Sequence, residues 1–222
     1  MANDLATRHD ALTNYRAARD AICRHLNGAM KFTSGKAIKQ AARKIGLLSS
    51  SVIVADSFSE MALAFDLVVF GAATDRSRAI DRYARASRFP AGSIDATVLE
   101  AMRVSKFHII QVKARHEIAG LVVDEVFRQD ELWLMNEGFE ETAEDGLVLA
   151  GRLVRLGPFC ATAGATVPLD RNVLQDALYS MVVARNRDFG PKTLDDPRLP
   201  EAIYAAAIRN GAMNAIAFGS EA

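Results

Sequence analysis

FHIIQVKAR, residues 107–115, marks the point where the pattern of this chain changes from helical to extended. Apolar and polar residues alternate through it with a period close to two, as in a β-strand with one buried face. Four further stretches have the length and the apolar or β-branched composition of strands, and turn sequences separate them. They are residues 120–127, 131–136, 147–156 and 159–167. We therefore predict a small antiparallel meander of five strands, curling towards a barrel.

The hundred residues before this stretch follow the helical period instead. Five segments carry apolar residues at helical spacing: residues 10–26, 34–45, 57–70, 75–88 and 93–102. Ser34 and Ser93 are expected to cap two of these helices, either Asp56 or Ser57 is expected to open a third, and Asn27-Gly28 is expected to end the first. The segment 57–70 is apolar on nearly every side, so we expect it to be the central buried helix of this region.

Two more helices are predicted after the strands, at residues 173–186 and 201–210. The predicted fold class is therefore α+β. Residues 1–105 form a helical layer and residues 106–169 a small antiparallel β barrel. The last part, residues 170–222, supplies two helices that pack back on the rest.

Charge is unevenly distributed along the chain, although it sums to zero. Residues 1–106 carry 16 Lys and Arg against 10 Asp and Glu, a balance of +6. Residues 107–169 carry 5 against 10, a balance of −5, and the remainder holds 6 against 7. This division predicts a basic solvent face on the helical part and an acidic one on the β part.

Composition also limits the class of protein. No apolar run reaches the length of a membrane span, and no apolar stretch follows a basic cluster near Met1, so neither a membrane protein nor a signal peptide is expected. Cys23 and Cys160 lie far apart in the chain, and free thiols are favoured over a disulfide. We expect a cytoplasmic protein.

Three runs carry a family resemblance: Gly120–Val126, Glu131–Leu134 and Glu144–Leu153. Together they resemble a barrel segment of uncharacterised bacterial proteins, in which a helical N-terminal part precedes a small β unit. The resemblance covers about a third of the chain, and its motifs are mostly structural. It implies a fold and no known activity.

A row of arginines is the clearest candidate for binding. Arg78, Arg82, Arg85 and Arg88 follow one another at spacings of four, three and three, which places them along one face of the fourth helix. Such a row can neutralise phosphates or dock against an acidic protein. The alternative is a solvated face with internal ion pairs, since Asp81 lies four residues before Arg85.

An acidic patch follows the third strand, in a segment that has the composition of a loop. It contains Glu137, Glu140, Glu141 and Glu144, with Asp145 beside them. The alternating ligand order of a calcium loop is missing, so an acidic surface is favoured over a metal site. Contact between this loop and the arginine row, within one chain or across a dimer, is a further hypothesis.

No catalytic residue, metal ligand or cofactor site is predicted. Ser34-Gly35-Lys36 lacks the upstream glycine and the following Ser or Thr of a phosphate-binding loop. Residues 38–58 match a helix-turn-helix in part, but Val52–Asp56 offers no side chain that reads base edges. The four histidines show no metal-ligand spacing, and no activated nucleophile is evident.

We therefore predict a non-catalytic interaction or adaptor protein. Its partner is another protein or a second copy of the chain, bound through the arginine row and the acidic patch. One alternative is a nucleic-acid-binding protein that uses the basic N-terminal helices. Another is a small-molecule or enzymatic role in a pocket between barrel and helices. Trp133, Phe139 and Phe159 are candidates to line its mouth, although core filling is the favoured role of these three residues.

Overall fold

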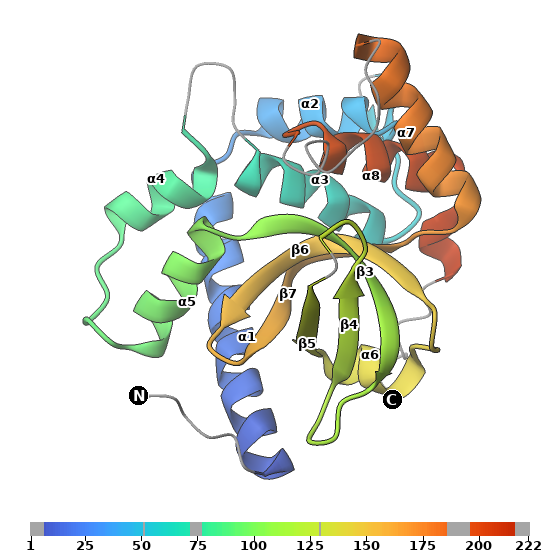
Figure 1. Ribbon diagram of the computed structural model, residues 1–222. Helices are drawn as coiled ribbons and strands as arrows, with labels where there is room; N and C mark the ends of the chain where they lie inside the picture. Colours follow the sequence, from blue (N-terminus) through green and yellow to red (C-terminus); the bar gives the residue numbers. More distant parts are fainter. Residues whose placement is uncertain (1–6, 51, 72–76, 129, 186–195, 216–222) are drawn as a thin grey trace.

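Figure 1 shows the computed structural model, which describes residues 7–50, 52–71, 77–128, 130–185 and 196–215. The fold is α+β, with helices packed around a curled five-stranded sheet (Figure 1). The helices are α1 (Arg8–Met30), α2 (Gly35–Lys44), α3 (Phe58–Phe70), α4 (Ala79–Ala86), α5 (Ile94–Arg103), α6 (Glu137–Thr142), α7 (Arg171–Arg185) and α8 (Leu199–Arg209), followed by a 3-10 turn, η2 (Ala212–Ala215). None of the described helices is long and apolar enough to cross a membrane.

The strands form two sheets. A short hairpin, β1 (Leu48–Ser49) and β2 (Val52–Ile53), connects α2 to α3. The larger sheet contains β3 (Lys106–Arg115), β4 (Leu121–Glu125), β5 (Glu131–Met135), β6 (Val148–Leu156) and β7 (Phe159–Pro168). Its strand order is β3-β4-β5-β7-β6, and β6 pairs back with β3, so the pairings form a closed ring.

The expected antiparallel meander is wrong in one respect, because β5 and β7 pair in parallel. The other four pairings are antiparallel. Strand directions cannot alternate all the way round a ring with an odd number of strands, so one pair must be parallel. The parallel joint is also the shortest in the ring, with only Leu134↔Cys160 and Met135↔Ala161 in register.

Three hydrophobic clusters hold the layers together. The first draws on all five strands of the ring and fills its inside, and Phe139 of α6 packs against one end. The second joins the outside of the sheet to α1, α3 and α5. The third joins it to α2, α3, α7 and α8. Helices therefore cover much of the outside of the ring, and the sheet lies at the centre of the fold.

The three predicted serine caps are confirmed, whereas the fourth helix is shorter than predicted and begins at Ala79 without a side-chain cap. The hydroxyls of Ser34, Ser57 and Ser93 accept hydrogen bonds from the backbone N–H groups three residues later. The Glu60 carboxylate also reaches back to the N–H of Asp56, at 2.7 Å, which completes a capping arrangement for α3. These starts could be predicted because a cap depends only on neighbouring residues.

One predicted helix end is wrong. Helix α1 does not stop at Asn27-Gly28 but continues to Met30. A Cβ atom at Gly28 would lie 2.5 Å from the ring of Tyr83 in α4. The glycine is therefore needed for the close approach of two helices, and it does not end the first one.

Candidate interaction surface

Arg78, the first arginine of the row, belongs to an internal network at the start of α4. Its guanidinium donates to both carboxylate oxygens of Asp81, at 2.7 and 2.9 Å, and to the carbonyl of Arg103 at 2.7 Å. Hydrogen bonds from Arg78, and then from Arg103, lower the pKa of Asp81. Because Asp81 already pairs with Arg78 and Arg103, the predicted ion pair between Asp81 and Arg85 is not formed. Arg78 is a structural residue.

The other three arginines bind only uncharged oxygens among the described residues. Arg82 donates to the carbonyls of Ser77 and Phe32, and Arg85 donates to the Ser77 hydroxyl. Arg88 donates to the carbonyls of Arg85 and Ser87, both at 3.1 Å. Arg85 and Arg88 are exposed. These contacts orient the guanidinium groups without compensating their charge.

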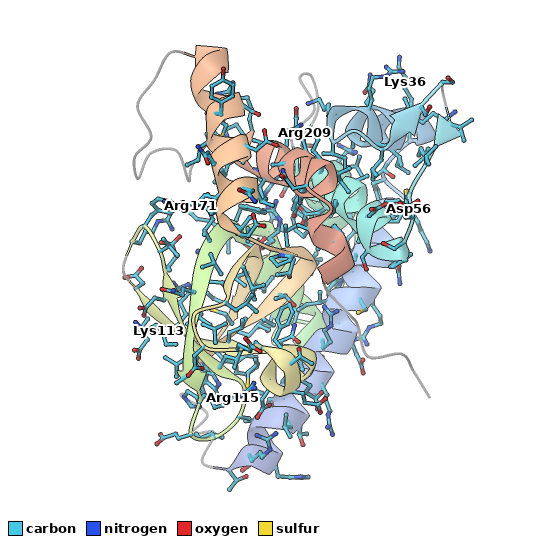
Figure 2. The ribbon with its side chains drawn as sticks, turned by 90° about the vertical axis from the view of Figure 1, so that its right-hand side faces the viewer. Lys36, Asp56, Lys113, Arg115, Arg171 and Arg209 are labelled. Atoms are coloured by element: carbon cyan, nitrogen blue, oxygen red, sulfur yellow. The ribbon has the colours of Figure 1, made fainter. Side chains whose placement is uncertain are left out.

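The hydrogen bond from Arg82 to Phe32 brings the arginine row against the loop that leads into α2. Helix α2 carries four basic residues and no acidic one. Its Lys36, Lys39 and Arg43 are exposed and contact no carboxylate of the described chain, whereas Lys44 pairs with Glu201 at 2.6 Å. Figure 2 shows Lys36 at the outer side of this helix.

We call these two groups together the basic surface. Its members are Lys36, Lys39 and Arg43 of α2, and Arg82, Arg85 and Arg88 of the α4 segment. Sequence reasoning found the second group and missed the first, although residues 31–44 contain no acidic residue at all. The two groups lie about 40 residues apart in the chain, and the hydrogen bond from Arg82 to Phe32 joins α4 to the segment that leads into α2.

Part of the acidic patch is a helix, α6, and not the expected loop: Glu137, Glu140 and Glu141 lie in it, whereas Glu144 and Asp145 follow it in a loop. The Asn136 side chain caps it by accepting from the N–H of Phe139, and Arg115 donates to the carbonyls of Phe139 and Ala143 at the other end. The signal for this helix was present in the sequence, because Asn is among the strongest capping residues.

Helix α1, and not the arginine row, supplies the partners of the acidic patch. Arg16 pairs with Glu137 at 2.6 Å, and Arg8 pairs with Glu140 at 2.5 Å. Glu141 and Glu144 are exposed and have no ion pair within the described residues. Within one chain, the hypothesis of a contact between acidic patch and arginine row is therefore wrong.

An apolar strip lies next to α2 and was not predicted. Helix α3 buries Leu63, Ala64, Asp66, Val69 and Phe70, but its other side is partly open. Phe58 is 80% exposed, and its ring contacts Phe65 edge to face, with centroids 6.4 Å apart. Val52 and Val54 in the preceding hairpin are also exposed. We define the apolar strip as Val52, Val54, Phe58, Met61 and Phe65.

The expectation that α3 is the central buried helix is thus wrong for one side. Phe58, Met61 and Phe65 follow the spacing i, i+3, i+7, which places them on one face. Met61 and Phe65 are partly exposed and belong to none of the three hydrophobic clusters. An apolar sequence cannot reveal which sides of a helix its neighbours will cover.

Buried polar groups are the places where catalysis would be sought. Asp66 of α3 and Arg152 of β6 form an ion pair, and Arg152 also lies over the ring of Phe70, 4.3 Å from its centroid. Asp66 and Arg152 are 2% and 7% exposed. The pair therefore joins helix α3 to the sheet. It is too deeply buried for a substrate to reach it.

His108 and Glu125 are a second buried set, in neighbouring strands. His108 Nδ1 and Glu125 Oε1 have no hydrogen-bond partner, while Glu125 Oε2 accepts from the N–H groups of Phe127 and Arg128. Burial, and then nearby cations with Arg128 foremost, lower the pKa of His108 to about 4. No group of three or more potential ligands in the described chain could hold a metal ion.

Trp133, a candidate to line the mouth of a pocket, packs against neighbouring residues. Its indole N–H donates to the carbonyl of Ala119 at 2.6 Å. One face stacks on His116, with centroids 4.0 Å apart, and Phe159 meets it edge to face. Trp133 is therefore a partly buried residue that packs against the second hydrophobic cluster.

One family model matches residues 9–184, which is most of the chain. The chain belongs to DUF7986, a family of unknown function. The resemblance to uncharacterised proteins is therefore confirmed. No curated protein and no solved structure matches the chain. The DUF7986 match includes α2, α3 and α4, so the basic surface and the apolar strip both lie within the family region.

Proposed function

We propose that this protein is a non-catalytic interaction module that binds an acidic protein through the basic surface. One observation carries the proposal: six cations, three on α2 and three on or just after α4, have no carboxylate partner among the described residues. Solvated helix faces usually mix charges of both signs at i, i+4 spacing, and α2 has no acidic residue with which to do so. An acidic surface would supply the missing charges and speed encounter.

Nucleic acid is the second candidate, because phosphates would suit the same cations. Two features favour protein. The segment after α2 forms the β1–β2 hairpin, so no second helix follows in the position of a recognition helix. The whole chain also has zero net charge, whereas nucleic-acid-binding domains are commonly basic overall.

The proposal also covers the role of the sheet and the cellular compartment. The closed ring of strands serves as a small barrel scaffold that presents surfaces, which agrees with its filled interior. The compartment is the cytoplasm, for which the free thiols of Cys23 and Cys160 give support.

Site-specific crosslinking in cells tests the function. A photoreactive amino acid at Lys39 is expected to capture a defined protein, and the same residue at Arg171, on the exposed side of α7, is not. The captured protein is then purified and titrated with the variants. Lys39→Glu and Arg85→Glu are each expected to weaken binding about fivefold or more, while Arg85→Lys and Arg171→Glu stay within twofold.

The nucleic-acid alternative has its own signature. Gel-shift titrations of a DNA duplex and a single-stranded RNA at about 50 and 200 mM salt would show a steep loss of affinity if phosphate contacts dominate. Crosslinks mainly to nucleic acid, together with this salt dependence, would contradict the protein-binding proposal.

A further inference from the structure

Helix α3 is apolar around most of its circumference, yet one side of it lacks cover. Helices of this composition are normally buried on all sides. Phe58 is 80% exposed, Val52 64% and Val54 55%, so three large apolar side chains open to solvent within seven residues. Contiguous apolar surface of this kind typically marks an interaction site.

The apolar strip lies beside the C-terminal end of α2, the helix that carries Lys36, Lys39 and Arg43. The N–H of Leu47 donates to the carbonyl of Ala42 at 2.8 Å, and the N–H of Val54 donates to the carbonyl of Leu47 at 2.9 Å. These bonds fix the hairpin beside the C-terminal end of α2. Ala41 and Ala42 of α2 also share a cluster with Leu63 and Ala64 of α3. Figure 2 shows Lys36 and Asp56 on the same side of the molecule.

We propose that the apolar strip and the α2 part of the basic surface together bind one acidic, amphipathic segment of a partner protein. Carboxylates of the segment pair with Lys36, Lys39 and Arg43, and its apolar side chains cover Phe58, Met61 and Phe65. This inference rests on the proposed function and specifies the chemistry of the partner.

Charge distinguishes this partner from the other occupants. A two-fold dimer through the strip would bring two copies of α2 together, each with four basic residues and no acidic one. Nucleic acid would satisfy the cations with phosphate but leave the apolar side chains exposed. A segment with both carboxylates and apolar residues satisfies both features at once.

Two synthetic peptides of about 16 residues test the proposal. One repeats Glu-Leu-Glu-Phe, and the other repeats Glu-Ser-Glu-Ser with the same charge. Fluorescence anisotropy is expected to show at least tenfold tighter binding of the apolar peptide. Phe58→Ser should remove most of this advantage while leaving the weak binding of the serine peptide unchanged. Lys36→Glu with Lys39→Glu should weaken both peptides.

Tyr179→Ser is the matched control, because Tyr179 is another exposed aromatic residue, at 68%, on α7, outside the apolar strip and the basic surface. It should change neither affinity. Phe58 and Tyr179 are both largely exposed, so circular dichroism should show both variants folded.

Equal affinity of the two peptides for the wild-type chain would overturn this inference while leaving the proposed function intact. Binding of neither peptide would overturn both. A concentration-dependent dimer in light scattering that Phe58→Ser abolishes would assign the strip to a second copy and overturn the inference as well.

Discussion

Asp66 and Arg152 are joined in the interior of the protein, with Oδ1 and Nε 3.2 Å apart, although 86 residues separate them in the chain. Asp66 comes from the buried side of α3 and Arg152 from the outer side of β6. The hydroxyl of Tyr204 is buried and has no hydrogen bond, and burial, with the charge of Asp66, raises its pKa well above the usual value. Three distant segments therefore meet at one charged pair.

Removal of one member of this pair should destabilise the fold strongly. Asp66→Ala leaves a buried guanidinium without a counter-charge, and we expect a loss of about 3–5 kcal/mol in the free energy of unfolding. Chemical denaturation of the purified variant measures this loss. Asp176→Ala, which breaks the exposed pair with Arg209, is the control and should cost about 1 kcal/mol or less.

Replacement of both members should be far less damaging. Asp66→Leu combined with Arg152→Met removes both buried charges, and such exchanges are often neutral or stabilising. A double variant as unstable as Asp66→Ala would show that the pair contributes more than charge compensation.

The glycine opposite this pair should tolerate no side chain. Gly164 has φ +99°, and a Cβ atom there would lie 2.5 Å from Asp66 Oδ1. Gly164→Ala should therefore cost about 2 kcal/mol or more in stability. Gly35→Ala is the comparison, since nothing lies within 4 Å of its Cβ position in α2. That change should stabilise the protein by about 0.5–1 kcal/mol, and thermal unfolding of both variants decides the matter.

Stability should fall in acid because of His108. The pKa of His108 is about 4 in the folded protein, against 6.5 for an ordinary histidine. Between these two pH values His108 is protonated in the unfolded chain and neutral in the folded one. The contribution of neutral His108 to the free energy of unfolding is fully present above pH 6.5 and is lost as the pH falls towards 4. The loss amounts to about 3 kcal/mol. Unfolding measured from pH 7 to 4 should show a smaller decline for His108→Gln. His9→Gln, exposed on α1, should follow the wild-type curve.

The acidic patch should divide into two classes of residue. Glu137 and Glu140 have arginine partners on α1, so Glu137→Gln and Glu140→Gln should each lower stability by up to about 1 kcal/mol. Glu141 and Glu144 have none among the described residues, so their Gln variants should leave unfolding unchanged. A loss of stability on Glu144→Gln would reveal a contact that the described residues do not make.

Local features of the fold could be predicted from the sequence. Helix starts depend on a capping side chain within three residues, as at Ser34 and Ser93, and strand positions depend on alternation within one stretch. Helix α6 was missed because its acidic composition outweighed the Asn136 cap. Gly28 was misread because its partner, Tyr83, is 55 residues away in the chain.

The candidate surface was predictable only in part. The spacing of Arg82 and Arg85 placed them on one face of a helix, but the predicted helix was too long, because α4 ends at Ala86 and Arg88 lies beyond it. Which arginine pairs with Asp81 depended on the orientation of that carboxylate. The exposure of Phe58 depended on how far α2 and the hairpin extend over α3. Contacts between distant segments decide such questions, and periodicity carries no information about them.

The pairing of β5 with β7 also determines when the ring of strands can close during synthesis of the chain. The ring lacks its last member until the ribosome has added residue 168, because β7 is the final strand along the chain. Until then, β5 and β6 each offer an unpaired edge to other chains. A chain that ends before β7 therefore leaves both edges open to pairing with other chains.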